Sequence, residues 1–222
     1  IASITKLLTV MVVLDVNPSM DEKLKLTTKI LDRLPSKSES LTRGNLISMA
    51  IINSSNRAAY TLCENYPGGV DACITAMNLK AKKLKMMDTQ FVDASGLSEE
   101  NVSTARNLIK MVLAAKNYPL IVKASQTSLV KIKLKNSWFS FKNTNPLIGQ
   151  QHKFIISKTG YTNPAGRCVL MLVEKGKELY ALVVLGQRNV RDRSRIVNDL
   201  LHIDFDKKLF DNSDKNSYKY IM

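Results

Sequence analysis

A change in the spacing of apolar residues, about two thirds of the way along the chain, limits the folds that it can adopt. Up to about residue 145 the apolar residues recur mostly at helical spacing, and after about residue 153 they form short strand-like runs. The run 169–173 is continuously apolar, which is typical of a strand covered on both faces. Residues 174–177 predict a hairpin turn into the next strand. The chain therefore predicts an α+β fold in which helices flank an antiparallel sheet.

Capping and terminating residues divide this pattern into elements. Helices are predicted over residues 3–14, 42–53, 57–65, 70–84, 104–116 and 190–203, and strands over 153–157, 168–174 and 179–186. The first helix is apolar on nearly every side, so we expect it in the core. Residues 31–40 predict a loop. We expect one domain over residues 1–204, with a helical lobe over about 19–145, and a polar tail without regular structure over 205–222.

Three short patterns follow one another along the chain. They are Ser3-Ile4-Thr5-Lys6, Ser54-Ser55-Asn56 and Lys158-Thr159-Gly160. Ser-x-x-Lys occurs again at Ser128–Lys131, so that pattern alone is weak, but Ser-x-Asn and Lys-Thr-Gly each occur once. Their order and their local contexts together predict a serine acyl-transfer site that uses lysine to handle protons.

Each pattern supplies residue types that such chemistry needs. Lys6 lies one helical turn after Ser3, and a lysine of lowered pKa in a partly buried site can take the proton of the serine hydroxyl. Ser54 and Asn56 lie in a turn between two helices. Ser54 can relay a proton between Lys6 and the leaving group, and Asn56 can hold a substrate amide or orient Lys6.

The third pattern follows a strand-like segment and suits substrate binding. The edge of a strand can align a peptide through backbone hydrogen bonds. Lys158 and Thr159 suit recognition of a substrate carboxylate, and Gly160 allows the substrate chain to come close.

The composition excludes some classes of protein and leaves others open. The net charge is +14, and because the lysines are scattered, we expect a solvated surface and no nucleic-acid partner. No apolar run approaches the ~20 residues of a membrane helix. Cys63 and Cys73 either pair across the turn at 66–69 or are small core residues, and Cys168 is expected to be buried and inert. The two histidines stand outside any metal-binding pattern, so no metal or cofactor is predicted.

At these residues the chain resembles the D-alanyl-D-alanine carboxypeptidase and endopeptidase family of penicillin-binding proteins. The likeness runs from residue 1 to about residue 186, and it is closest to the endopeptidase branch that includes penicillin-binding protein 7. It is carried by residues 1–9 and 158–168 and by five further segments, 55–59, 66–69, 94–98, 101–106 and 143–145.

The resemblance implies a fold of the serine β-lactamase and DD-peptidase type and roles for the site residues. Ser3 is the residue acylated by peptidoglycan stem peptides, Lys6 is the general base, and Ser54 and Asn56 are its partners. Lys158 and Thr159 bind the carboxyl side of the substrate, and the backbone N–H groups of Ser3 and Tyr161 form the oxyanion hole. β-Lactam antibiotics are implied as covalent inhibitors.

The resemblance also implies a periplasmic or other extracytoplasmic location, a role in cell-wall shape, and peripheral contact with the wall or membrane. Family members carry a signal peptide and strands ahead of the nucleophile. The first pattern here begins at residue 3, so we expect this chain to lack its natural N-terminus and those strands.

Three alternatives to an endopeptidase remain open. A carboxypeptidase has the same pattern chemistry. A serine β-lactamase shares the fold, although the Glu-x-x-Asn of one lactamase class does not occur in this sequence. An inactive wall-binding scaffold fits the positive charge, although the complete set of site residues disfavours it.

Overall fold

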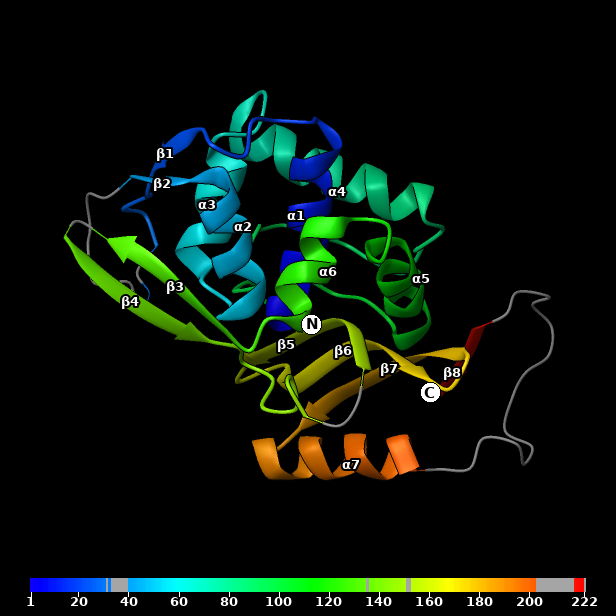
Figure 1. The fold of residues 1–222 in the computed structure, drawn as a ribbon. Coiled ribbons are helices and arrows are strands. Elements are labelled where there is room, and N and C mark those ends of the chain that lie inside the picture. Colours follow the sequence, from blue (N-terminus) through cyan, green and yellow to red (C-terminus); the bar gives the residue numbers. More distant parts are fainter. Residues whose placement is uncertain (31, 33–39, 135, 151–152, 203–217, 222) are drawn as a thin grey trace.

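The computed structural model describes residues 1–30, 32, 40–134, 136–150, 153–202 and 218–221, and for 218–221 the backbone only (Figure 1). Most of the predicted loop over 31–40 lies outside the described residues, and so does His152. The helices are η1 Ala2–Ile4, α1 Thr5–Asp15, α2 Arg43–Ile52, α3 Asn56–Glu64, α4 Gly69–Lys83, α5 Ala105–Ala115, α6 Pro119–Gln126 and α7 Val190–His202. The strands are β1 Lys23–Lys25, β2 Ser40–Thr42, β3 Leu129–Leu134, β4 Ser137–Lys142, β5 Lys153–Thr162, β6 Gly166–Lys175, β7 Glu178–Gln187 and β8 Tyr218–Ile221.

A sheet with the strand order β5-β6-β7-β8 separates two layers of helices. Strands β5, β6 and β7 are antiparallel, and β8 pairs in parallel with β7. Helix α7 packs on one face of the sheet, and the other helices lie beyond the opposite face (Figure 1). The predicted α+β fold is confirmed, and strand β5 forms one edge of the described sheet.

Strand β6 shows why its apolar run is continuous. Cys168, Leu170 and Leu172 belong to the core shared with the large helical layer. Val169, Met171 and Val173 alternate with them and belong to a second core beneath the sheet, together with Val197 and Leu201 of α7. Both faces of the strand are therefore covered, as the run predicts.

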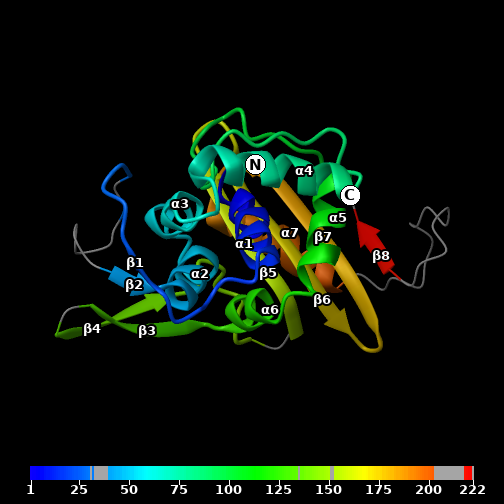
Figure 2. The same ribbon diagram turned by 90° about the horizontal axis from the view of Figure 1, so that it is seen from above.

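Helix α1 lies at the centre of the helical layer. In the view from above, α2, α3, α4, α5 and α6 surround it (Figure 2). Every residue from Thr5 to Val13 is buried, which agrees with the apolar character expected on all sides of this helix. Residues in the first turn of α1 are therefore buried and packed against other elements.

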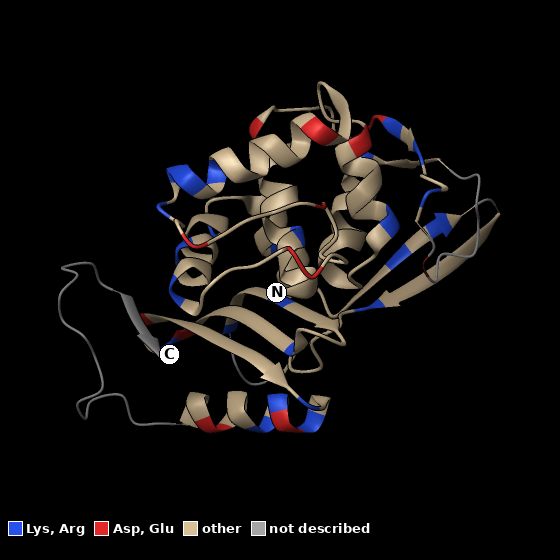
Figure 3. Cartoon of the chain, turned by 180° about the vertical axis from the view of Figure 1, so that it is seen from behind, with Lys and Arg blue, Asp and Glu red and all other residues tan. Residues whose placement is uncertain are grey.

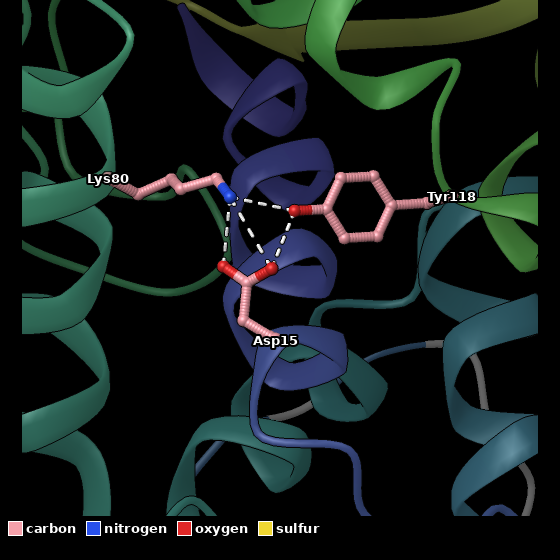
Figure 4. Close-up of polar contacts among 3 residues, drawn as sticks. All are labelled: Asp15, Lys80 and Tyr118. Atoms are coloured by element: carbon pink, nitrogen blue, oxygen red, sulfur yellow. Dashed lines mark hydrogen bonds and ion pairs between the residues drawn. The ribbon is translucent and has the colours of Figure 1, made fainter.

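The C-terminal end of α1 is tied to two other parts of the helical layer. The Lys80 ammonium of α4 donates a 3.0 Å hydrogen bond to the Asp15 carboxylate and a 2.7 Å bond to the hydroxyl of Tyr118, which in turn donates to Asp15 at 2.6 Å (Figure 4). A disulfide between Cys63 and Cys73 links α3 to α4, so of the two alternatives open for these cysteines the pair is the one formed.

Three regions differ from the sequence prediction. Pro119, expected only to end a helix, is the first residue of the unpredicted helix α6, because its missing N–H costs nothing at that position. Strands β3 and β4 were not predicted, and they form a hairpin that lies beside α2. The tail was expected to lack regular structure, but Tyr218–Ile221 pairs with the open edge of β7.

The predicted domain boundaries and the question of a membrane-spanning helix remain to be compared with the structure. The helical lobe over about 19–145 and the domain over 1–204 stay predictions. None of the helices formed by the described residues has the length and apolarity needed to cross a membrane.

Candidate active site

The structure places the Ser3 hydroxyl and the Lys6 amine in direct contact. Ser3 lies in the 3₁₀ turn η1 that leads into α1, and Lys6 lies in the first turn of α1. Lys6 Nζ donates to Ser3 Oγ at 2.6 Å and to the carbonyl oxygen of Ser95 at 2.5 Å. Ser3 is partly exposed, whereas the Lys6 side chain is fully buried. A hydroxyl open to a ligand is thus paired with an amine shielded from water.

Two glycines hold the backbone around Ser3. A Cβ on Gly96 would lie 1.9 Å from the carbonyl oxygen of Ala2, and Gly96 also has a φ of +79°. A Cβ on Gly160, in β5, would lie 3.0 Å from the backbone nitrogen of Ser3. Ala2 itself has a φ of 48°, which is uncommon outside glycine. The serine therefore depends on close backbone packing from both sides.

Burial sets the protonation state of Lys6. It lowers the pKa of the Lys6 amine from 10.5 to about 7, and the negative charges of Asp93 and Asp32 partly oppose this shift. At neutral pH about half of the molecules therefore carry an uncharged amine beside the Ser3 hydroxyl. Such an amine can accept the proton that the hydroxyl must lose to become a nucleophile.

Ser54 and Lys158 form a second amine–hydroxyl pair, and Lys158 is near enough to Lys6 for the charge of Lys6 to lower its pKa. Ser54 lies in the turn between α2 and α3 with a φ of 62°, a backbone conformation that is uncommon outside glycine. Lys158 Nζ of β5 donates to Ser54 Oγ at 2.8 Å and to the carbonyl oxygen of Thr159 at 3.0 Å. Burial, then the charges of Lys6 and Arg193, lower the pKa of Lys158 well below 10.5.

The remaining predicted residues lie on β5 and at the start of α3. The Thr159 hydroxyl is hydrogen-bonded to that of Thr144 at 2.6 Å. Tyr161 is 46% exposed, and the Arg167 guanidinium lies 3.6 Å from the centre of its ring. All three residues of the Lys158–Gly160 pattern lie inside β5, which extends to Thr162 and is longer than predicted. Asn56 is the first residue of α3, and its contact with Lys6 or a substrate stays a prediction.

Three residues that sequence reasoning did not assign belong to this region. The Ser95 carbonyl accepts from Lys6. Thr144 joins Thr159 through its side chain, and its backbone nitrogen donates to the carbonyl oxygen of Ile52 at 2.9 Å, just before the Ser54 turn. Arg193 of α7 is buried, and burial and the charge of Arg167 lower its pKa. Ser95 and Thr144 could have been found from the sequence, because they lie in the segments 94–98 and 143–145 that carry the family resemblance. Arg193 lies in a predicted helix without a motif, so no signal in the sequence indicated it.

Basic groups dominate the electrostatics of the site. After burial, the charges of Lys6 and Arg193 lower the pKa of Lys158, and the charge of Arg167 lowers the pKa of Arg193. Such a cluster favours an anionic ligand, because a negative charge would relieve the mutual repulsion. Within the described residues, no three His, Cys, Asp or Glu side chains gather as metal ligands.

A buried lysine one turn from a serine, with a second buried lysine on an edge strand, is the arrangement expected of a serine acyl-transfer site on a fold of the DD-peptidase and β-lactamase type. The chain belongs to the D-alanyl-D-alanine carboxypeptidase family, peptidase family S11, whose family model matches residues 1–189.

Individual relatives and structures agree with this membership. The chain is 43% identical over 195 residues to a D-alanyl-D-alanine endopeptidase of Escherichia coli and 40% identical to one of Pseudomonas aeruginosa, each alignment covering 83% of this chain. The chain spans 63% of the length of each of these relatives. A structure of penicillin-binding protein D2 from Listeria monocytogenes, in the cefotaxime-bound form, is 28% identical with a TM-score of 0.77, covering 90% of this chain and 85% of that one.

Proposed function

We propose that this chain is the catalytic domain of a serine DD-peptidase that cuts D-alanyl-D-alanine cross-links in peptidoglycan through an acyl-enzyme. The observation that carries the proposal is the 2.6 Å contact between Ser3 Oγ and the amine of Lys6, whose pKa is about 7. Similarity to two proteins named D-alanyl-D-alanine endopeptidase supports the choice of substrate.

In the first step, Ser3 Oγ attacks the carbonyl carbon of the substrate peptide bond while the neutral Lys6 amine takes the hydroxyl proton. The carbonyl oxygen becomes an oxyanion, and the backbone N–H groups of Ser3 and Tyr161 donate to it. The close approach of Gly160 to the Ser3 nitrogen supports this assignment, because it brings the two backbone segments together.

The tetrahedral intermediate then collapses, and the leaving amine needs a proton. The Ser54 hydroxyl, held by Lys158 at 2.8 Å, relays the proton from Lys6 to the leaving nitrogen. A water molecule then attacks the ester carbonyl while Lys6, neutral again, takes a proton from it. When this second tetrahedral intermediate collapses, Lys6 returns the proton to Ser3 Oγ, and the free acid leaves. Asn56, the first residue of α3, holds the amide of the acyl part of the substrate.

The carboxyl side of the substrate lies along β5. The Thr159 hydroxyl, which donates to Thr144 Oγ1 in the free protein, turns to donate to the substrate carboxylate and accepts from Thr144 instead. Lys158 and Arg193 contribute positive potential. A carboxylate beside Lys158 would raise the pKa of this amine, which burial and its basic neighbours otherwise lower. β5 is an edge strand of the described sheet, so its backbone can align an extended peptide.

A D-alanyl-D-alanine carboxypeptidase is the second candidate. The matching family model bears that description, and a protein named D-alanyl-D-alanine carboxypeptidase from Bacillus subtilis is 27% identical to this chain. Purified cross-linked dimer and monomeric pentapeptide should be incubated in parallel with the protein. Preferential cleavage of the dimer supports the endopeptidase, and cleavage of the pentapeptide alone contradicts it.

β-Lactams are proposed as covalent inhibitors that acylate Ser3. The structure of penicillin-binding protein D2 from L. monocytogenes, which resembles this chain, was determined in cefotaxime-bound and ampicillin-bound forms. A long-lived adduct with fluorescent penicillin supports a peptidase, whereas rapid loss of the adduct indicates a β-lactamase. An absence of labelling at Ser3 favours a non-enzymatic wall-binding scaffold.

We also propose a periplasmic or other extracytoplasmic location with peripheral contact to wall or membrane, and a role in cell shape through cross-link cleavage. The Cys63–Cys73 disulfide supports this location, because disulfides persist in oxidising compartments and are rare in the reducing cytosol.

A further inference from the structure

Most of the net positive charge of the chain comes from one segment, because that segment contains no acidic residue. Between Glu100 and Glu174 the sequence contains no acidic residue, and the intervening residues include 11 lysines and arginines, against a net charge of +14 for the whole chain. Along the sequence, the lysines are therefore not evenly mixed with acidic residues. A region of one charge sign attracts a ligand of the opposite sign.

The β3–β4 hairpin orders part of this charge on one face. Residues directly opposite in an antiparallel pair share a face, and the register pairs Lys133 with Trp138, Lys131 with Ser140 and Leu129 with Lys142. We call these six residues the basic hairpin face. All six are exposed, and the single tryptophan of the chain is 68% exposed. Figure 3 shows lysine colouring and no acidic colouring on these strands.

The opposite side of the hairpin fixes its orientation. Ile132 and Leu134 are buried, and Val130, Phe139 and Phe141 pack against the main core. The apolar side of the hairpin is therefore already used for packing. The basic hairpin face is held outward by that packing, and no ion pair to Lys131, Lys133 or Lys142 occurs within the described part of the chain.

The basic hairpin face leads directly to the candidate active site. Lys142 is two residues before Thr144, which is also exposed and whose hydroxyl is bonded to Thr159 of β5. The base of the hairpin is closed by a 2.8 Å hydrogen bond from the Asn143 nitrogen to the Ser128 carbonyl oxygen. From Trp138 to Thr144 the extended chain spans about 20 Å. The face thus begins at the end of the site proposed to bind a carboxylate and extends away from it.

The composition of the face matches a polymer that carries both carboxylates and sugar rings. Lysine ammonium groups attract carboxylates without demanding one geometry. An exposed tryptophan offers a broad apolar surface beside a polar N–H, which suits contact with the apolar side of a sugar. Peptidoglycan offers free carboxylates on its stem peptides and sugar rings in its glycan strands.

We propose that the basic hairpin face is an accessory site that holds peptidoglycan outside the cleft while one of its peptides reaches Ser3. The identity of the polymer rests on the proposed function, and the existence of a binding face rests on the hairpin alone. Because the polymer extends far beyond one peptide bond, a second contact raises the effective concentration of cleavable bonds at the site.

The test measures binding and acylation separately. Binding of the Ser3→Ala protein to purified insoluble peptidoglycan is measured by sedimentation, so turnover cannot remove the ligand. Addition of Lys131→Glu, Lys133→Glu and Trp138→Ala is expected to weaken binding at least tenfold. In the protein that keeps Ser3, the same three changes should leave the rate of acylation by fluorescent penicillin within twofold of the unmodified protein.

A matched control carries Lys82→Glu and Lys83→Glu at the exposed end of α4, far from the hairpin (Figure 1). It should bind peptidoglycan like the parent protein. Equal weakening in both variants, or no weakening in the hairpin variant, would overturn the proposal. Hairpin-dependent binding to anionic phospholipid vesicles or DNA that is as tight as binding to peptidoglycan would also overturn it.

A further variant is used in case the triple variant does not fold. If the triple variant loses penicillin acylation, Trp138→Ser alone is used, because this side chain is mostly exposed and supports no core contact. It should weaken binding at least threefold, and an unchanged affinity would refute the accessory site. Failure of the unmodified chain to react with penicillin contradicts the proposed function and leaves the sedimentation result interpretable.

Discussion

The pH dependence of Ser3 acylation follows from the burial of Lys6. If the neutral amine is the general base, the acylation rate is proportional to the fraction of Lys6 without a proton. With a pKa of about 7, that fraction is about 1% at pH 5, about 9% at pH 6, about 50% at pH 7 and about 91% at pH 8. The rate should therefore rise steeply with pH up to about 7 and level off above 8.

These fractions distinguish a buried amine from an ordinary one. Between pH 6 and pH 7 the second-order rate constant should rise about fivefold, and between pH 8 and pH 9 by only about a tenth. An unperturbed lysine of pKa 10.5 would give a rise of about tenfold per pH unit throughout this range. The assay is the rate of covalent labelling by fluorescent penicillin at each pH, with the folded state checked by circular dichroism.

Two variants identify the titrating group. Lys6→Arg replaces the amine with a guanidinium that stays protonated, so acylation should fall by at least about 100-fold at every pH. Lys82→Arg makes the same exchange at an exposed position of α4 and should leave the profile unchanged. A wild-type rate that climbs tenfold per unit to pH 9, or that is flat from pH 5 to 9, would refute the role assigned to Lys6.

Three further predictions test the surroundings of the site. Gly160→Ala places a methyl group 3.0 Å from the Ser3 nitrogen and should slow penicillin acylation at least tenfold, whereas Gly176→Asn, at a turn position with open space around it, should not. Thr144→Ala removes the hydroxyl bonded to β5 and should raise the KM for carboxylate-bearing peptides severalfold with little effect on kcat, and Thr144→Ser should restore it; a kcat effect alone would contradict this role. Replacing both Cys63 and Cys73 by Ala opens a loop with a sequence separation of 10 and should cost about 3 kcal/mol, seen as a fall in Tm of roughly 5–10 °C; an unchanged Tm would show that the bond adds no stability.

Local spacing in the sequence was sufficient to predict the contacts between site residues that lie close together along the chain. Ser3 and Lys6 are three residues apart at the start of a helix, so their side chains share a face whatever the rest of the fold does. The predicted helices over 42–53 and 104–116 are formed, and Thr42 and Thr104 accept from backbone N–H groups at the starts of α2 and α5. The continuous apolar run of β6 likewise indicated a strand covered on both faces.

Contacts between distant residues could not be predicted in the same way. The lysines of β3 were interpreted as scattered surface charges, because the partner strand that places them beside Trp138 has to be folded before a shared face exists. The same holds for Thr144, which lies after β4 and contacts Thr159 only because this loop packs beside β5. It also holds for Arg193, whose influence on Lys158 depends on the packing of α7.

The amino-acid sequence by itself therefore determined the residue types of the site, their order, the α+β class and the family. Only the tertiary structure decided the protonation of Lys6, since its pKa depends on water being excluded by helices and strands far away in the chain. It also decided that Cys63 reaches Cys73 and that Lys158 faces Ser54. Local geometry is a property of a few neighbouring residues, whereas burial and long-range distance are properties of the whole packed chain.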